Sequence, residues 1–293
     1  MLLSEIVATL CGMSAAASYE EHVRYISLVR REGGEPIVGI TYREMSVDPD
    51  LVASFVLAVI IFENRQLRRF VKEGYVVVIE EGQQMVGLLI IDKVEDEEPY
   101  RESLKNIIKS FETKYEGQLA SWKGDVRPFR EFALHIVEIY PYRRFDWELV
   151  PRLAKKSDPA LDSFAPIPWS VGEADKKIQT AVSFINGKRT IFEIMQSTGM
   201  SSEETTAIIS ILDHFGWTTF GRKITEKTIL VKLTDPHKFL VGVYGEQINN
   251  FVELCDGKRT LKDVGAMLAY SMEVLLTVAK NLVDARVLGF HDE

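Results

Sequence analysis

The first half of the chain alternates between β-rich runs and apolar helical stripes. Residues 22–31 and 36–42 are rich in β-forming side chains and flank Gly33-Gly34, a pattern that predicts a β-hairpin. Residues 75–80 and 85–91 predict a second hairpin, and few polar residues interrupt either strand. Such strands are typical of a well-covered sheet.

A helix predicted between the two hairpins is apolar nearly all round. Asp48-Pro49 suits its start, because Asp can cap free N–H groups and Pro fits the first helical position. The helix would cover residues 50–66, and from residue 52 to residue 62 only Ser54 is polar. A helix of this kind is buried on more than one side. Either the N-terminal segment or the C-terminal domain covers it, or it forms a partner surface of Val52, Phe55, Val56, Val59 and Ile60.

Two amphipathic helices follow the second hairpin. Apolar residues recur at three- and four-residue spacings over residues 104–119, and a further helix is predicted over residues 129–139. The order of hairpin, helix, hairpin and two helices predicts an α+β fold, with one antiparallel sheet and segregated helices.

Residues 20–141 resemble the longin/roadblock superfamily. Three segments carry the resemblance: ISLVRREGGEPIVGI, GYVVVIEEGQQMVGLLIIDK and FETKYEGQLASWKGDVRPF. The resemblance implies a longin-like domain that binds a small GTPase or a second longin/roadblock-type subunit, and it leaves a homodimer open. It also implies a place in trafficking or nutrient-signalling complexes.

The second half of the chain contains one helical unit twice. Residues 181–220 align with residues 251–290 at an offset of 70 without gaps, and both copies carry the sequence Gly-Lys-Arg-Thr. Gly187 and Gly257 can adopt the left-handed conformation that ends a helix. Thr190 and Thr260 can cap the next helix in a capping box, and Ser201, like its counterpart Ser271, can cap a third.

These units predict winged helices. In the first copy, three short helices precede a β-ribbon predicted over residues 217–220 and 228–233, joined by residues 221–223. The second copy ends soon after its third helix, so its wing is short. The repeated turn also resembles small winged-helix repeats that follow a DGxRT turn. Residues 149–172, with four prolines, predict a linker of extended character.

Winged helices often bind DNA, but the third helices argue against it here. The helix in SSEETTAIISILDHF has no Lys or Arg, and SMEVLLTVAKNLVDA has only Lys280. Groove reading needs Arg, Lys, Asn or Gln that point at base edges. A nucleic-acid alternative therefore depends on basic side chains near the wing and the repeated turn. These are Arg222, Lys223, Lys227, Lys188, Arg189, Lys258 and Arg259.

The charge of the chain also argues against nucleic-acid binding. The net charge is −8, with −7 in residues 1–150 and −1 in residues 151–293, so neither half is basic.

Two cysteines far apart predict no disulfide framework or zinc site, and suggest a reducing cytoplasm. The longest apolar stretch is shorter than the ~20 residues that a transmembrane helix needs. The five histidines lack metal-ligand spacing, and no phosphate-binding loop is present, so we expect no enzyme and no cofactor.

The sequence thus predicts five segments: an N-terminal extension (1–19), a longin-like domain (20–148), a Pro-rich linker (149–172), and winged helices at 173–241 and 242–293. The order of domains resembles nitrogen-permease-regulator-like proteins. We expect a non-catalytic, cytoplasmic scaffold or regulator of a small GTPase that acts by protein–protein interaction. The alternative is a DNA-binding transcriptional regulator with an N-terminal sensor or dimerisation domain.

Overall fold

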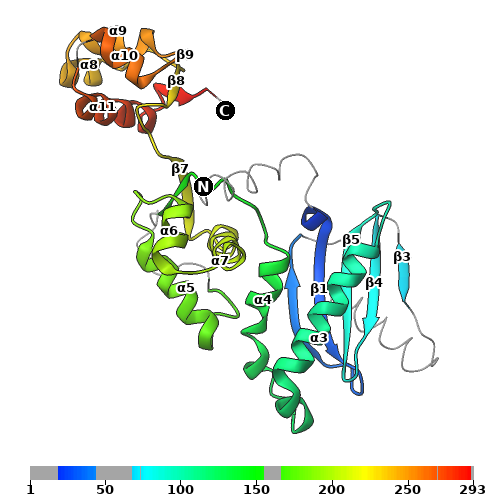
Figure 1. Cartoon of the computed structure of the whole chain (residues 1–293). Helices are drawn as coiled ribbons and strands as arrows, with labels where there is room; N and C mark the ends of the chain where they lie inside the picture. Colours follow the sequence, from blue (N-terminus) through cyan, green and yellow to red (C-terminus); the bar gives the residue numbers. More distant parts are fainter. Residues whose placement is uncertain (1–18, 44–67, 73, 155–165, 269, 292–293) are drawn as a thin grey trace, which may run out of the picture. The chain divides into compact units, whose positions relative to one another are not determined.

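A computed structural model describes residues 19–43, 68–72, 74–154, 166–268 and 270–291 (Figure 1). The chain divides into two compact units, Met1–Gly221 and Arg222–Glu293. Both combine helices with antiparallel strands, in agreement with the predicted α+β class.

A five-stranded antiparallel sheet forms the base of the first unit. After the short helix η1 (Tyr19–His22), its strands are β1 (Val23–Arg30), β2 (Pro36–Thr41), β3 (Arg69–Lys72), β4 (Tyr75–Glu81) and β5 (Met85–Asp92). The spatial order is β2-β1-β5-β4-β3, which places β2 and β3 at the two edges. Both predicted hairpins are confirmed, because β1 pairs with β2 and β4 pairs with β5.

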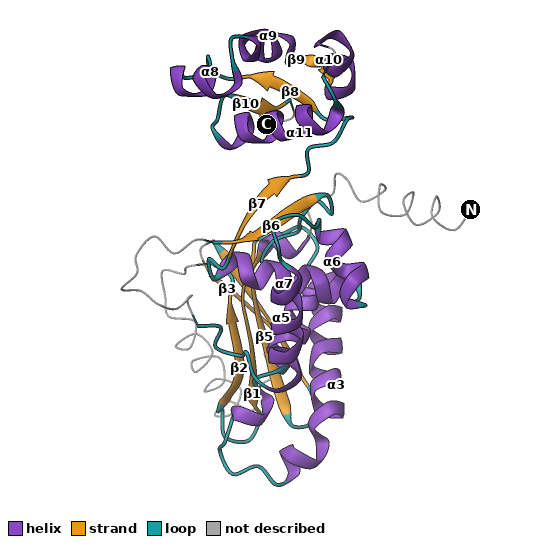
Figure 2. Cartoon of the chain, turned by 90° about the vertical axis from the view of Figure 1, so that its left-hand side faces the viewer, coloured by secondary structure: helices purple, strands orange, loops and turns teal. Residues whose placement is uncertain are grey.

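Two helices pack on one face of this sheet. They are α3 (Glu98–Ala120) and α4 (Phe132–Ile139), with the short helix η2 (Arg127–Phe129) between them (Figures 1 and 2). Buried side chains of α3, such as Leu104 and Phe111, lie at helical spacing and share a core with Ile26 and Leu89 of the sheet. The opposite face of the sheet is also apolar and buried, with Val77, Val86, Leu88 and Ile90 at 0–1% exposure among its members.

The first helical repeat belongs to the same unit. It comprises β6 (Leu149–Leu153), α5 (Gly172–Phe184), α6 (Ile191–Thr198), α7 (Ser202–His214) and β7 (Thr218–Arg222). Helix α7 packs against α4, and its apolar side chains join the core of the sheet domain. In the predicted linker, β6 forms a strand and Ile167 and Trp169 are buried, while residues 155–165 lie outside the described part of the chain.

The predicted β-ribbon of the first winged helix is wrong. Strand β7 pairs with β6 instead of with β8 (Ile229–Lys232), and the amide of Ala154 donates to the carbonyl of Trp217 at 2.9 Å beside this pair. Strand β8 has β9 (Asp256–Thr260) on one side and β10 (Leu288–Phe290) on the other. With both of its edges occupied, β8 has no free edge for β7.

The second unit builds a separate core around this three-stranded sheet. Its helices are α8 (Lys238–Tyr244), α9 (Gln247–Leu254), α10 (Leu261–Leu268) and α11 (Met272–Asp284). Leu230, Phe251, Val264 and Leu282 are among its buried members. No single described helix is long and apolar enough to cross a membrane, and the α10–α11 pair that together reaches this length is bent by 117°.

Candidate functional site

The repeated Asn/Asp-Gly-Lys-Arg-Thr turn has one geometry in both copies. In the first copy, the side-chain oxygen of Asn186 accepts hydrogen bonds from the amides of Lys188 and Arg189 at 3.0 and 3.1 Å. Gly187 adopts φ 70°, and Thr190 forms a capping box with Glu193 at the start of α6. The predicted glycine conformation and helix cap are therefore confirmed for this copy.

The second copy repeats these contacts with an aspartate in place of the asparagine. The carboxylate of Asp256 accepts from the amides of Lys258 and Arg259 at 3.0 and 3.2 Å, and Gly257 has φ 76°. These amide donors lower the pKa of Asp256 below its usual value. Thr260 exchanges hydrogen bonds with Asp263 at the start of α10.

The arginine of each turn has a structural role. Arg189 donates to the carbonyl of Phe184 at 3.4 Å, near the end of α5, and its guanidinium lies over the ring of the same residue, 5.2 Å from the ring centroid. Arg259 makes the matching contact with the carbonyl of Leu254 and an ion pair with Asp256 at 3.4 Å. A cation beside the last carbonyls of a helix is favourable, so these two arginines stabilise their own repeat.

The third helices of the two repeats have opposite environments. Ala207, Ser210 and Ile211 of α7 are fully buried, each at 0% exposure. At the offset of 70 their counterparts on α11 are Thr277, Lys280 and Asn281, and all three are exposed. Helix α7 is therefore enclosed by its own unit, whereas one side of α11 faces solvent.

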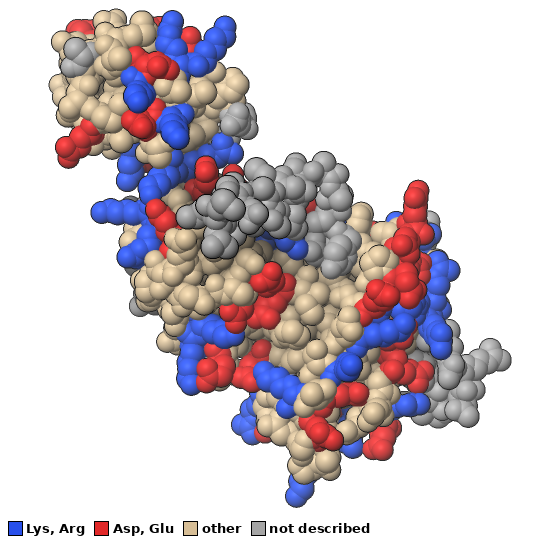
Figure 3. Space-filling model, viewed as in Figure 1, with Lys and Arg blue, Asp and Glu red and all other residues tan. Residues whose placement is uncertain are grey.

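The predicted nucleic-acid residues divide between the two units. Lys188 and Arg189 lie in the first unit, and the other five lie in the second. In the second unit, the amide of Lys262 donates to the carbonyl of Glu226 at 2.9 Å, which places the loop carrying Lys227 beside the start of α10. Arg222 lies over the ring of Phe290 at 5.6 Å. Figure 3 shows basic side chains intermingled with acidic ones on both units.

The predicted partner helix falls in a part of the chain that the structure does not describe. Val52, Phe55, Val56, Val59 and Ile60 all lie within residues 44–67, outside the described residues. This surface therefore remains a prediction from sequence.

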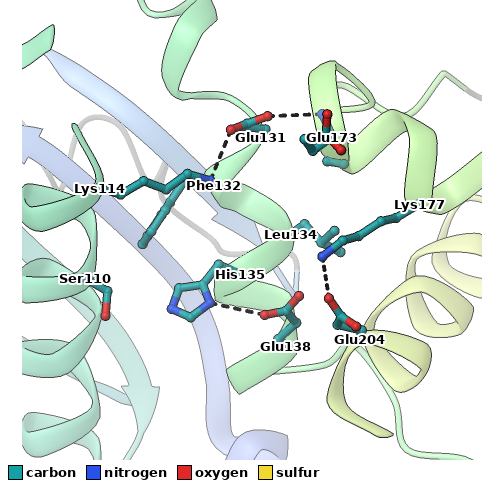
Figure 4. Close-up of a pocket in the computed structure, with 11 residues that line it drawn as sticks. Ser110, Lys114, Glu131, Phe132, Leu134, His135, Glu138, Glu173, Lys177 and Glu204 are labelled. Atoms are coloured by element: carbon teal, nitrogen blue, oxygen red, sulfur yellow. Dashed lines mark hydrogen bonds and ion pairs between the residues drawn. The ribbon is translucent and has the colours of Figure 1, made fainter. Parts of the chain in front are cut away.

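The structure reveals a pocket that the sequence did not indicate. It has a volume of about 300 Å³ and lies where α3, α4, α5 and α7 meet in the first unit (Figure 4). Its lining residues are Ser110, Lys114, Glu131, Phe132, Leu134, His135, Glu138, Glu173, Ala174, Lys177 and Glu204. Because these residues come from four helices far apart in sequence, no local motif could have identified them.

Glu131 connects three of the helices around this pocket. Its carboxylate contacts the ammonium group of Lys114 on α3 at 3.1 Å and accepts from the amide of Glu173 in the first turn of α5 at 3.2 Å. The hydroxyl of Tyr115 also donates to it, at 3.4 Å. Partial burial opposes ionisation of Glu131, but these hydrogen bonds outweigh it and hold its pKa below the usual value.

The other charged groups of the pocket are paired as well. Lys177 of α5 forms an ion pair with Glu204 of α7, which raises the pKa of Lys177 and lowers that of Glu204. His135 contacts Glu138 at 3.1 Å through Nδ1. Ion pairs therefore join α3 to α4 and α5 to α7, and the hydrogen bond from the amide of Glu173 to Glu131 links these two pairs of helices.

The pocket does not form a recognisable catalytic centre. A histidine oriented by a carboxylate is one part of a nucleophilic triad, and Ser110 lines the same pocket, but no hydrogen bond joins Ser110 to His135 among the described contacts. Within the described residues, no group of three or more His, Cys, Asp or Glu side chains is arranged to hold a metal ion. Comparisons with protein-family models and with curated proteins give no match to this chain.

Proposed function

We propose that the protein is a non-catalytic scaffold or regulator of a small GTPase that acts through protein–protein contacts. The burial of α7 is the observation that carries this proposal. In a DNA-binding winged helix, the third helix must enter the major groove with one side free. Here Ala207, Ser210 and Ile211 of α7 are fully buried, whereas their counterparts on α11 face solvent.

The sheet domain supports a longin-like assignment. Its strand order is β2-β1-β5-β4-β3, and α3 packs on one face after the last strand. The resemblance in sequence over residues 20–141 implies GTPase or subunit partners for such a domain. The first helical repeat extends this domain, because α4 and α7 pack directly on each other.

A pull-down with the full-length chain tests the proposal. Lysate from the cells that produce the protein is prepared with and without nuclease treatment, and each sample is loaded either with GDP or with a non-hydrolysable GTP analogue. Recovery of a small GTPase that depends on the nucleotide would support the proposal. Recovery that disappears with nuclease treatment would instead identify nucleic acid as the partner.

Two variants locate the contact. Val56→Asp and Val59→Asp place a charge in the predicted partner surface, and each should abolish capture of the GTPase. Val274→Asp is the matched control, because Val274 of α11 is 50% exposed and lies outside that surface. Unchanged capture by both variants would exclude the predicted surface.

Nucleic-acid binding by the second unit is the second candidate function. Lys223, Lys227 and Lys258 are exposed, and the solvent-facing side of α11 is not covered by the packing that encloses α7. The double variant Lys223→Glu/Lys227→Glu should lower affinity for labelled duplex DNA and flatten its salt dependence if this candidate is correct. Fluorescence anisotropy at two salt concentrations measures both effects.

A further inference from the structure

One glutamate of the pocket in the first unit differs from the others in its contacts. Four glutamates and two lysines line this pocket, together with His135. Three of the glutamates form ion pairs with lysines: Glu131 with Lys114 at 3.1 Å, Glu173 with Lys176 at 2.6 Å, and Glu204 with Lys177. Among the described ion pairs, Glu138 contacts only His135, at 3.1 Å. The residues that line the pocket therefore have a surplus of negative charge at Glu138.

Helix ends explain the other three glutamates but not Glu138. Glu131 occupies the N-cap of α4, and Glu173 and Glu204 lie in the first turns of α5 and α7. Carboxylates are favourable at these positions, because the helix dipole is positive at the N-terminus. Glu138 lies in the last turn of α4, where the dipole is negative, and its side chain is only 19% exposed. A largely buried carboxylate in this position is costly unless a cation compensates it.

A second carboxylate lies close to Glu138. The pKa of Lys177 is raised chiefly by its hydrogen bond to Glu204, and the charge of Glu138 adds to this effect. Figure 4 shows both carboxylates near the end of the Lys177 side chain. One ammonium group is thus shared by carboxylates from α4 and α7. A second cation at this point would reduce the repulsion between them.

Apolar and aromatic side chains form other parts of the pocket wall. Phe132, Leu134 and Ala174 are only 1–4% exposed. The ring of His135 packs against Phe132 with the centroids 5.0 Å apart, and its side chain is 41% exposed. Part of the imidazole ring is therefore accessible to a ligand. The volume of about 300 Å³ is at the lower end of the range for small-molecule pockets.

We propose that this pocket binds a small organic cation through a guanidinium group. The planar fork of N–H donors can bind the carboxylates of Glu138 and Glu204, and the flat face can stack on the imidazole of His135. A primary ammonium group would match the charge, but it is more strongly hydrated and has no flat face. The carbon chain of the ligand would lie against Phe132 and Leu134. The inference goes beyond the proposed regulation of a GTPase and does not depend on it.

Calorimetric titration of the full-length chain tests the site. Butylguanidinium presents the group on a short carbon chain, and butylurea is its neutral counterpart of similar shape. Butylguanidinium should bind, whereas butylurea should not, because it lacks the charge that the two carboxylates select. A Gly-Arg-Gly peptide with blocked ends distinguishes two sources of the group. Tighter binding of the peptide would identify an arginine side chain as the ligand, and tighter binding of butylguanidinium would identify a free compound.

Two variants of the pocket should change the affinity in opposite directions. Glu138→Gln keeps the shape and removes the charge, so it should weaken the binding of butylguanidinium about tenfold or more. Lys177→Met removes the internal cation that competes for the same carboxylates, so it should strengthen binding roughly threefold. Glu116→Gln is the matched control, because Glu116 is an exposed residue of α3 outside the pocket, and it should bind like the wild type.

The pair of variants separates a binding role from a purely structural one, because damage to the fold cannot increase affinity. Circular dichroism verifies that each variant is folded. Failure of both guanidinium probes to bind the wild type, or equal binding of butylurea, would overturn the proposal. So would a folded Glu138→Gln that binds as tightly as Glu116→Gln, or a folded Lys177→Met that shows no gain in affinity.

Discussion

Single glycines of this chain have different structural requirements. Gly187 and Gly257 hold φ values of 70° and 76° in the repeated turns. An L-residue in that conformation costs about 1–2 kcal/mol, so Gly187→Ala and Gly257→Ala should each destabilise the protein by roughly that amount. Gly117→Ala should stabilise it by up to about 1 kcal/mol, because Gly117 lies in α3 with open space at its Cβ position. Urea unfolding measures all three, and equal effects would contradict this reasoning.

Glu131 should make stability depend on pH. Its folded-state pKa is lowered, so its ionic contacts stabilise the protein above the unfolded pKa of about 4.3 and are lost as the pH falls through the folded value. Glu131→Gln removes the charge that pairs with Lys114 and should cost about 1–2 kcal/mol at pH 7. Urea unfolding of both proteins at pH 7 and at pH 4 measures whether the variant's loss of stability is larger at pH 7. A gap between variant and wild type that is as large at pH 4 as at pH 7 would argue against this role.

At the scale of elements, the third helices of the repeats should respond differently to the same substitution. Ala207 of α7 is fully buried against neighbouring elements, so Ala207→Asp introduces an unpaired charge into the core and should lower the melting temperature strongly or prevent folding. Thr277 is its exposed counterpart on α11, and Thr277→Asp should change stability by no more than about 0.5 kcal/mol. Thermal unfolding followed by circular dichroism compares them, and similar losses in both variants would contradict the burial of α7.

The elements that the sequence predicts well are those with local signals. The hairpins at β1–β2 and β4–β5 follow from β-rich runs around glycine turns, and the capping boxes follow from residues only three apart. The ribbon was wrong because strand pairing is not local. Strand β6, which pairs with β7, contains Pro151 and lies in the segment that its prolines predicted to be a linker.

The candidate functional site is also only partly predictable from local signals in the sequence. The run AIISIL in α7 is apolar at every position except Ser210. Such a run indicates a helix that is covered on more than one side, and this signal could have excluded α7 from a DNA groove. The pocket carries no such signal. Lys114, Glu131, Lys177 and Glu204 come together only because α3, α4, α5 and α7 pack around one point.

Among the described residues, each buried apolar cluster belongs to one of the two units, and the two units should unfold independently. The first unit ends at Gly221, and the buried residues of the second unit form a cluster of their own around Leu230 and Leu282. Leu282→Ala should lower the stability of the second unit by about 2–5 kcal/mol, because Leu282 is fully buried there. Leu104 of α3 is equally buried in the first unit, so Leu104→Ala is the matched substitution.

Differential scanning calorimetry of the full-length chain tests whether the two units unfold independently. Each variant should shift one transition to lower temperature and leave the other unchanged, since neither substitution removes a contact from the other core. Limited proteolysis during partial unfolding should then release the second unit from Leu282→Ala and degrade the first unit of Leu104→Ala. One common transition that moves in both variants would mean that the units fold as a single cooperative body. Both helical repeats would then stabilise the sheet domain. The second unit would no longer be a candidate for a separate binding module.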